Sequence, residues 1–98
     1  MATEANAAPA YRADKEPLLK RLRRIEGQVR GVGRMVEEER YCIDVVTQIT
    51  AIEAALDKVA LGLLEEHAQH CVIGADAGRQ EERTTELMDA VRRLLRHG

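Results

Sequence analysis

Apolar residues recur through residues 41–71 at the spacing of an α-helix. Six of them follow one another in alternating steps of four and three: Val45, Ile49, Ile52, Leu56, Val59 and Leu63. This is the period of an amphipathic helix whose apolar stripe faces a packing partner. The stretch contains no proline and a single glycine, so we predict one long helix over its whole length.

Two flanking segments carry the same pattern and are also predicted to be helical. The first starts near Pro17, with Asp14 as a candidate cap, and ends near residue 39 or 40. Its apolar stripe consists of Leu18, Leu22, Ile25, Val29, Val32 and Val36. The third helix starts near residue 80 or 81, after a break at Gly74–Gly78.

No segment alternates like a β-strand, and the chain lacks Phe and Trp, so its core must be aliphatic. The predicted class is therefore all-α, a three-helix protomer whose first two helices form an antiparallel hairpin. We divide the 98 residues into a disordered tail, 1–14, and a single helical domain, 15–98. A chain this short buries a modest core, so association with further copies is expected.

Positive charge is concentrated in one segment, although the whole chain carries a net charge of −2. Residues 12–34 hold eight basic residues against three acidic ones. Such a segment is either a DNA-facing surface or an ordinary solvated helix face. No short recognition helix follows a tight turn, so DNA binding would use the face of a helical bundle rather than a helix-turn-helix.

Both cysteines and two of the three histidines lie within residues 41–71. Cys42 and His67 are 25 residues apart, which places them on one helix face, within roughly 20°, but about 37 Å apart along the axis. Two antiparallel copies of the helix would bring Cys42 of one beside His67 of the other. His67 and Cys71 are four residues apart and can chelate together. The spacing therefore suggests two thiolates and one imidazole shared between subunits.

Other interpretations of these residues stay open at this point. A cysteine on an apolar helix face is usually a small buried hydrophobe, and a histidine there is often a hydrogen-bonded core residue. A disulfide between Cys42 and Cys71 would have to join two chains, because the ends of one helix are too far apart. His70 lies off the line from Cys71 to His67, and we interpret it as a surface residue rather than a fourth ligand.

Three segments together resemble the copper-sensitive operon repressors, the CsoR family: RLRRIEGQVRG, YCIDVVTQITAI and LLEEHAQHCV. The resemblance covers roughly residues 15–97. It implies a three-helix protomer without a helix-turn-helix, paired as an antiparallel bundle, with dimers assembling into a homotetramer. It further implies one Cu(I) per protomer at the subunit interface. Cu(I) binding would release the repressor from its operator DNA and allow copper-efflux genes to be transcribed.

The resemblance also suggests roles for single residues. Cys42 of one subunit would bind Cu(I) with His67 and Cys71 of the other. Tyr41 and Glu86 match the pair that hydrogen-bonds near the metal-binding histidine, with Glu82 as the alternative acid. The positions that hold the operator correspond to Arg21 and Lys58, supported by Lys20, Arg23 and Arg24.

Several rival functions are less well supported. Nickel- and cobalt-sensing members of the family add a histidine near the N-terminus, and this chain has none before His67. Persulfide-sensing members lack the metal-binding histidine. A copper-buffering protein would not need the basic segment. A thiol enzyme would need two subunits to join Cys42 and His67, and shows no oxyanion-hole or substrate-loop pattern, so we expect neither catalysis nor a small-molecule substrate.

The expected compartment is the cytoplasm. Two cysteines without a signal sequence argue for a reducing environment. No apolar run approaches the ~18–20 residues of a membrane span, so no membrane partner is expected.

Overall fold

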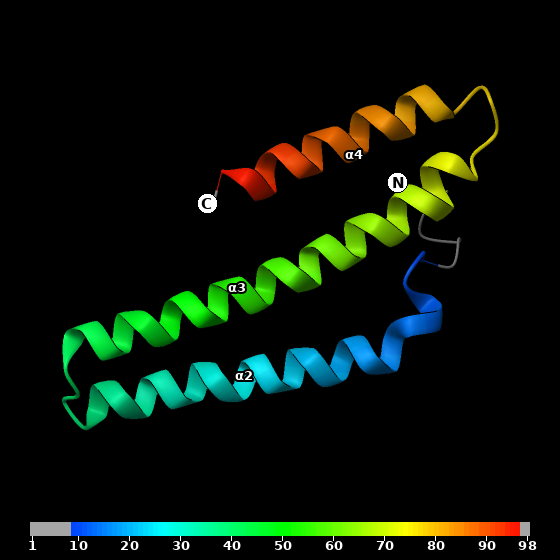
Figure 1. Cartoon of the computed structure of the whole chain (residues 1–98). Helices are drawn as coiled ribbons and strands as arrows, with labels where there is room; N and C mark the ends of the chain where they lie inside the picture. Colours follow the sequence, from blue (N-terminus) through cyan, green and yellow to red (C-terminus); the bar gives the residue numbers. More distant parts are fainter. Residues whose placement is uncertain (1–8, 97–98) are drawn as a thin grey trace. The chain divides into compact units, whose positions relative to one another are not determined.

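The computed structural model describes residues 9–96, so residues 1–8, most of the predicted tail, and residues 97–98 lie outside the description. Within the described range the chain is helical and contains no strand (Figure 1). The elements, in order, are η1 (Arg12–Asp14), α2 (Lys15–Glu37), α3 (Cys42–His67), η2 (Ala68–Ile73) and α4 (Gln80–Leu95). The predicted all-α class with three α-helices is confirmed.

The described residues fall into two compact units. One unit is Glu16–Val59, which contains α2 except its first residue and most of α3. In it the two helices run antiparallel (Figure 1). The prediction of a helical hairpin is therefore confirmed for this unit.

A Schellman motif ends α2. The amide of Arg40 donates to the carbonyl of Met35, and the amide of Glu39 donates to that of Val36, both at 3.0 Å. Glu39 has a φ of 56°, the left-handed conformation that this motif requires after a helix. These bonds satisfy carbonyls at the helix end, and α2 therefore stops at Glu37, two or three residues before the position expected from the apolar pattern.

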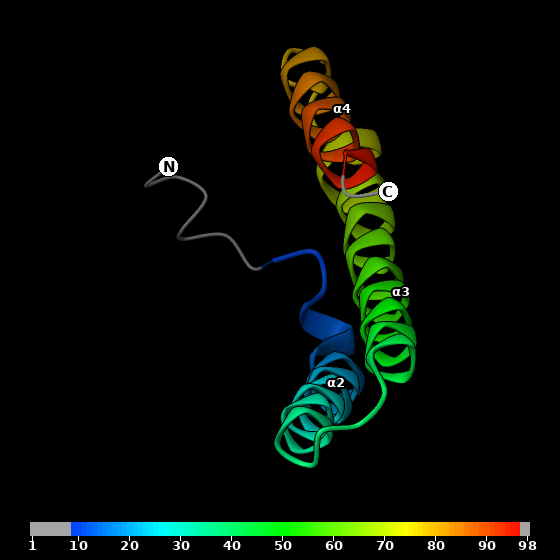
Figure 2. The ribbon, with the colours of Figure 1, turned by 90° about the vertical axis from the view of Figure 1, so that its left-hand side faces the viewer.

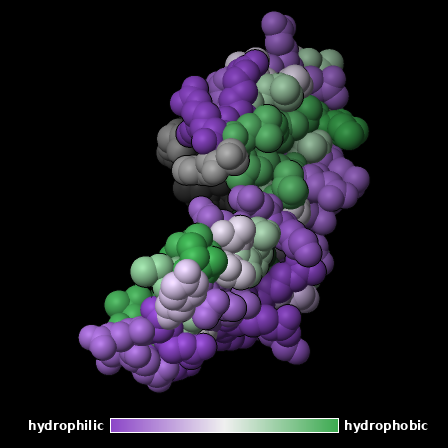
Figure 3. Space-filling model, turned by 60° about the vertical axis from the view of Figure 1, so that its left-hand side comes forward, coloured by the Kyte–Doolittle hydropathy of each residue, from purple (hydrophilic) through white to green (hydrophobic). Residues whose placement is uncertain are grey.

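The core of this unit is small. Ile25 on α2 and both Ile52 and Val59 on α3 are buried, with exposed fractions of 6 to 7%. All three belong to the predicted apolar stripes, so their helices face each other. Other members of the same stripes remain exposed: Leu22, Val29, Val36, Ile49 and Leu56. Figure 3 shows apolar surface on one face of the molecule, interrupted by hydrophilic side chains.

The second unit comprises residues up to Lys15 and from Ala60 onward. Here α4 lies beside η2 and the last turns of α3 (Figures 1 and 2). The side-chain amide of Gln80 donates to the carbonyls of Ile73 (3.3 Å) and Ala75 (3.4 Å), which fastens the connection between η2 and α4. The start of α4 at Gln80 agrees with the sequence prediction.

The long helix predicted over residues 41–71 changes character near its end. The α-helical hydrogen bonding stops at His67, and Ala68–Ile73 form a π-helix. A π-helix closes its hydrogen bonds one residue later than an α-helix, and such turns are frequent at functional sites. The expectation of one uninterrupted α-helix was wrong for this segment, because the apolar period does not distinguish the two helix types here.

The predicted division into a tail and one domain stays a prediction. Within the predicted tail, residues 12–14 form the short 3-10 helix η1, and residues 9–15 belong to the same compact unit as α4. No helix among residues 9–96 is long and apolar enough to cross a membrane.

Candidate metal centre

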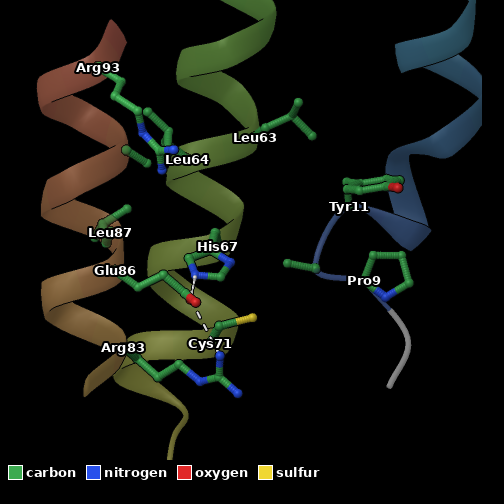
Figure 4. Close-up of a pocket in the computed structure, with 12 residues that line it drawn as sticks. Pro9, Tyr11, Leu63, Leu64, His67, Cys71, Arg83, Glu86, Leu87 and Arg93 are labelled. Carbon is green, nitrogen blue, oxygen red and sulfur yellow. Dashed lines mark hydrogen bonds and ion pairs between the residues drawn. The ribbon is translucent and has the colours of Figure 1, made fainter. Parts of the chain in front are cut away.

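A pocket of about 470 Å³ lies in the unit that contains η2 and α4 (Figure 4). Its apolar walls come from Leu63 and Leu64 on α3 and from Leu87 and Ala90 on α4. The polar groups that line it are His67, Cys71, Arg83, Glu86 and Arg93. The pocket therefore gathers thiol, imidazole, carboxylate and guanidinium groups against an apolar wall.

His67 and Cys71 lie on this pocket together, as their spacing predicts. His67 is the last residue of α3, and Cys71 lies in η2. The side chains of both are partly buried, and Cys71 is a free thiol. More than four residues make one turn of a π-helix, so a side chain four positions after His67 stays on nearly the same side of the chain.

Glu86 reaches His67 from the neighbouring helix α4. Its Oε1 lies 3.3 Å from Nε2 of the imidazole. The structure thus places Glu86, rather than the alternative Glu82, at the histidine. Because this contact uses Nε2, the other ring nitrogen, Nδ1, is left for a metal. A carboxylate in this position can orient a metal-binding imidazole.

The same carboxylate oxygen also contacts Arg83. Nη1 of Arg83 lies 3.4 Å from Oε1 of Glu86, so this oxygen joins a guanidinium to an imidazole (Figure 4). The sequence analysis missed Arg83. An acid three residues after an arginine on one helix is a common ion pair, but this spacing did not distinguish Arg83 from the other basic residues.

The chain segment before α2 also lines the pocket. Pro9, Ala10 and Tyr11 belong to its lining, and Pro9 and Tyr11 lie across from His67 and Cys71 (Figure 4). The sequence analysis assigned these residues to a disordered tail and did not connect them with the site. Nothing in their composition indicated this position, since they carry no motif and no apolar period.

Comparison with known proteins identifies the family. The family model described as "Metal-sensitive transcriptional repressor" matches residues 14–93. The chain is 50% identical over 93 residues to the copper-sensing transcriptional repressor RicR of Mycobacterium tuberculosis, covering 92% of this chain and 97% of the relative. This chain belongs to the CsoR family of metal-sensitive transcriptional repressors.

Two solved structures resemble this CsoR-family chain. One is the copper-sensing repressor CsoR with Cu(I) from Geobacillus thermodenitrificans, with a TM-score of 0.81 and 50% identity, covering 91% of this chain and 94% of that one. The other is the nickel-responsive transcriptional regulator InrS, with a TM-score of 0.70 and 41% identity, covering 81% and 90%. Transcriptional repressors act on DNA, and they are not a class of enzymes.

The remaining predicted metal ligand lies at the opposite end of α3. Cys42 is the first residue of that helix and is exposed, as is its neighbour Tyr41. Both belong to the unit of residues 16–59. Within residues 9–96, no cluster of three or more His, Cys, Asp and Glu side chains could hold a metal ion. The structure therefore brings together two of the three predicted donors, and the roles of all three remain predictions.

The donor chemistry fits Cu(I). Thiolate sulfur is a soft ligand that favours Cu(I), and imidazole is an accepted partner for copper.

His70 lies outside the pair formed by His67 and Cys71. Its side chain is exposed and its Nε2 lies 3.3 Å from Oε2 of Glu66, one helical turn earlier. That position agrees with its interpretation as a surface residue.

The predicted DNA contacts all belong to the other unit. Lys20, Arg21, Arg23 and Arg24 are exposed on α2, and Lys58 is exposed on α3. Their side chains are thus accessible for phosphate contacts. Their assignment to the operator surface remains a prediction.

Proposed function

We propose that this CsoR-family chain is a Cu(I)-responsive repressor. It binds operator DNA without metal and leaves the DNA when Cu(I) binds, so that copper-resistance and efflux genes are transcribed. The observation that carries this proposal is the pairing of His67 and Cys71 in one pocket, with Glu86 on the imidazole. The relatives named as copper-sensing support the choice of metal.

The proposed site holds one Cu(I) per protomer at a subunit interface. His67 and Cys71 would come from one subunit and Cys42 from its partner, in a homodimer that assembles further into a homotetramer. The exposed members of the apolar stripes on α2 and α3 support such an assembly, because association would cover them. Cu(I) accepts a low coordination number and soft sulfur ligands, which suits a repressor of the reducing cytoplasm.

Nickel is the second candidate inducer, because the nickel-responsive regulator InrS is a structural neighbour. A divalent nickel ion favours more nitrogen and oxygen donors than Cu(I) does. This chain has no histidine before His67 to extend the site from the N-terminal side. The donor set therefore favours copper.

The metal preference can be tested directly. We expect operator binding, measured by fluorescence anisotropy without oxygen, to be lost when one equivalent of Cu(I) per protomer is added. The same amount of Ni(II) or Zn(II) should leave most of the complex intact. Release by Ni(II) with no response to Cu(I) would overturn the proposal in favour of a nickel sensor. Failure to bind any copper-operon fragment would instead favour a copper-buffering protein.

The DNA surface can be tested separately from the metal site. Arg21→Ala and Lys58→Ala should each weaken metal-free operator binding by roughly tenfold, because each removes a positive charge from the phosphate-facing surface. The logarithm of affinity should also fall steeply and linearly with the logarithm of salt concentration. Cu(I) affinity should stay near the wild-type value in both variants.

Arg92→Ala is the matched control for this test. It removes an exposed arginine on α4, paired with Asp89 at 2.7 Å, and should change operator affinity little. A flat salt dependence, or equal losses in Arg21→Ala and Arg92→Ala, would argue against this surface.

A further inference from the structure

Arg83 differs from the other arginines in ion pairs by its burial. Its side chain is 14% exposed, whereas those of Arg30 and Arg92 are 63% exposed. A guanidinium keeps its positive charge at all physiological pH values. Removing such a charge from water is costly, and a nearby negative group must offset the cost. The charge of Arg83 therefore makes the electrostatic potential in the pocket that it lines more positive.

The carboxylate of Glu86 offsets part of this charge. It lies at 3.4 Å, a long hydrogen-bonding distance, and the same oxygen is shared with His67. Arg93 lines the same pocket and adds a second positive charge. Arg83 also lines a second hollow with Cys71, beside Gly74 and Ala75. The guanidinium thus lies near the thiol that is the proposed metal ligand (Figure 4).

The charge of a bound metal complex depends on the ion. Two thiolates with Cu(I) carry a net charge of −1, whereas two thiolates with a divalent ion are neutral. A neighbouring fixed cation stabilises the first complex and has little net attraction for the second. Without Arg83, the positive charge beside the thiolates would be smaller, and the preference for the Cu(I) complex would weaken.

We propose that Arg83 is a specificity-determining residue, whose positive charge beside Cys71, on a side chain that is only 14% exposed, favours Cu(I) over divalent ions at the same thiolates. This inference rests on the proposed Cu(I) site. Arg83 acts through charge and not as a ligand. It also holds the carboxylate of Glu86 toward the imidazole, but that positioning effect is common to every metal, whereas the charge effect separates one class of ion from the other.

The experiment compares Cu(I) and Zn(II) affinities in full-length wild type, Arg83→Gln, Arg83→Lys and Arg92→Gln. Each affinity is measured without oxygen by competition with a chromophoric chelator. Arg92→Gln is the matched control, because it removes the same charge and an ion pair of the same three-residue spacing on the same helix. We expect Arg83→Gln to lower Cu(I) affinity by roughly 10- to 100-fold, as loss of one nearby charge requires. Arg83→Lys should retain most of the affinity.

The ratio of Cu(I) affinity to Zn(II) affinity tests the role of Arg83. In Arg83→Gln the preference for Cu(I) over Zn(II) should narrow, because Zn(II) affinity falls by less than Cu(I) affinity, while Arg92→Gln keeps the wild-type ratio. Equal losses for both metals would indicate a purely structural role and overturn the inference. So would an Arg83→Lys variant as weak as Arg83→Gln, or an Arg83→Gln variant that binds Cu(I) like wild type.

The outcome for wild type separates this inference from the proposed function. If wild type binds Cu(I) and leaves its operator, but Arg83→Gln keeps the wild-type metal preference, the repressor function stands and the role of Arg83 falls. If wild type does not bind Cu(I), the proposed function falls first and the inference falls with it.

Discussion

Replacing either cysteine by alanine is expected to lower Cu(I) affinity by more than about 100-fold. Loss of a residue that only orients a metal ligand lowers affinity by roughly 10- to 100-fold, and loss of a ligand should cost more. Cys42→Ala and Cys71→Ala should lose affinity to a similar extent. In the proposed assembly each Cu(I) takes one sulfur from each of two subunits, so either substitution removes one thiolate from every site. Competition with a chromophoric Cu(I) chelator, without oxygen, measures the loss.

His70→Ala is the control for this prediction. His70 lies next to Cys71 in η2, but its side chain is exposed and contacts Glu66. The variant should keep wild-type Cu(I) affinity. Full-affinity binding by Cys42→Ala would rule out a site shared between subunits, and a large loss in His70→Ala would show that the ligand set had been assigned wrongly.

His67→Ala should separate metal binding from DNA release. Two thiolates can still hold Cu(I), so affinity should fall less than in the cysteine variants. Operator binding without metal should remain near the wild-type value. Addition of one Cu(I) per protomer should no longer weaken operator binding, because copper can release DNA only if it binds the DNA-free conformation more tightly than the DNA-bound one.

The contact between His67 and Glu86 is the structural reason for this expectation. The imidazole is the donor that touches α4, through Nε2 and Oε1 at 3.3 Å. A metal on Nδ1 would therefore act on α4 through one ring, whereas a metal held by sulfur alone would lack this connection. Coupling energies between two sites are typically ~1–3 kcal/mol, or about 5- to 150-fold in affinity. We expect His67→Ala to lose an effect of Cu(I) on operator affinity of this size.

Operator affinity of His67→Ala with and without Cu(I) provides the measurement. Glu86→Gln is the informative companion, since it keeps the imidazole and removes the carboxylate charge. It should retain Cu(I) binding and lose part of the copper response. If copper still weakens operator binding by His67→Ala as much as in wild type, the coupling must depend on the approach of Cys42 and Cys71 across the interface.

Much of the fold followed from the period of the apolar residues. The pattern Val45, Ile49, Ile52 predicted α3, and Ile52 is one of the two residues that are buried on this helix. The start of α4 followed from the glycines before it. The end of α2 was less well predicted, because it depends on two backbone hydrogen bonds and on the left-handed conformation of Glu39. The residue types at these positions do not indicate such a motif.

The candidate site was predicted in part. The four-residue spacing of His67 and Cys71 was sufficient to place them together, and the resemblance pointed to Glu86. The choice between Glu86 and Glu82 depended on the length of the connection after η2, which the sequence does not determine. Arg83 could not be selected among fifteen basic residues, because what distinguishes it is burial against a carboxylate, and burial depends on how α4 packs on η2.

The π-helical turn that carries Cys71 affects the thermodynamics of metal capture. Helical segments with unusual hydrogen-bond spacing are less favourable than regular α-helix, and such segments open locally more readily than a packed core. Each local opening of η2 would remove Cys71 from the site, and the observed binding constant would be reduced by the fraction of time spent open. Substitutions at Ala68, Gln69 and Val72, which have no donor role in the proposed site, are then expected to change the sensitivity of this repressor to copper.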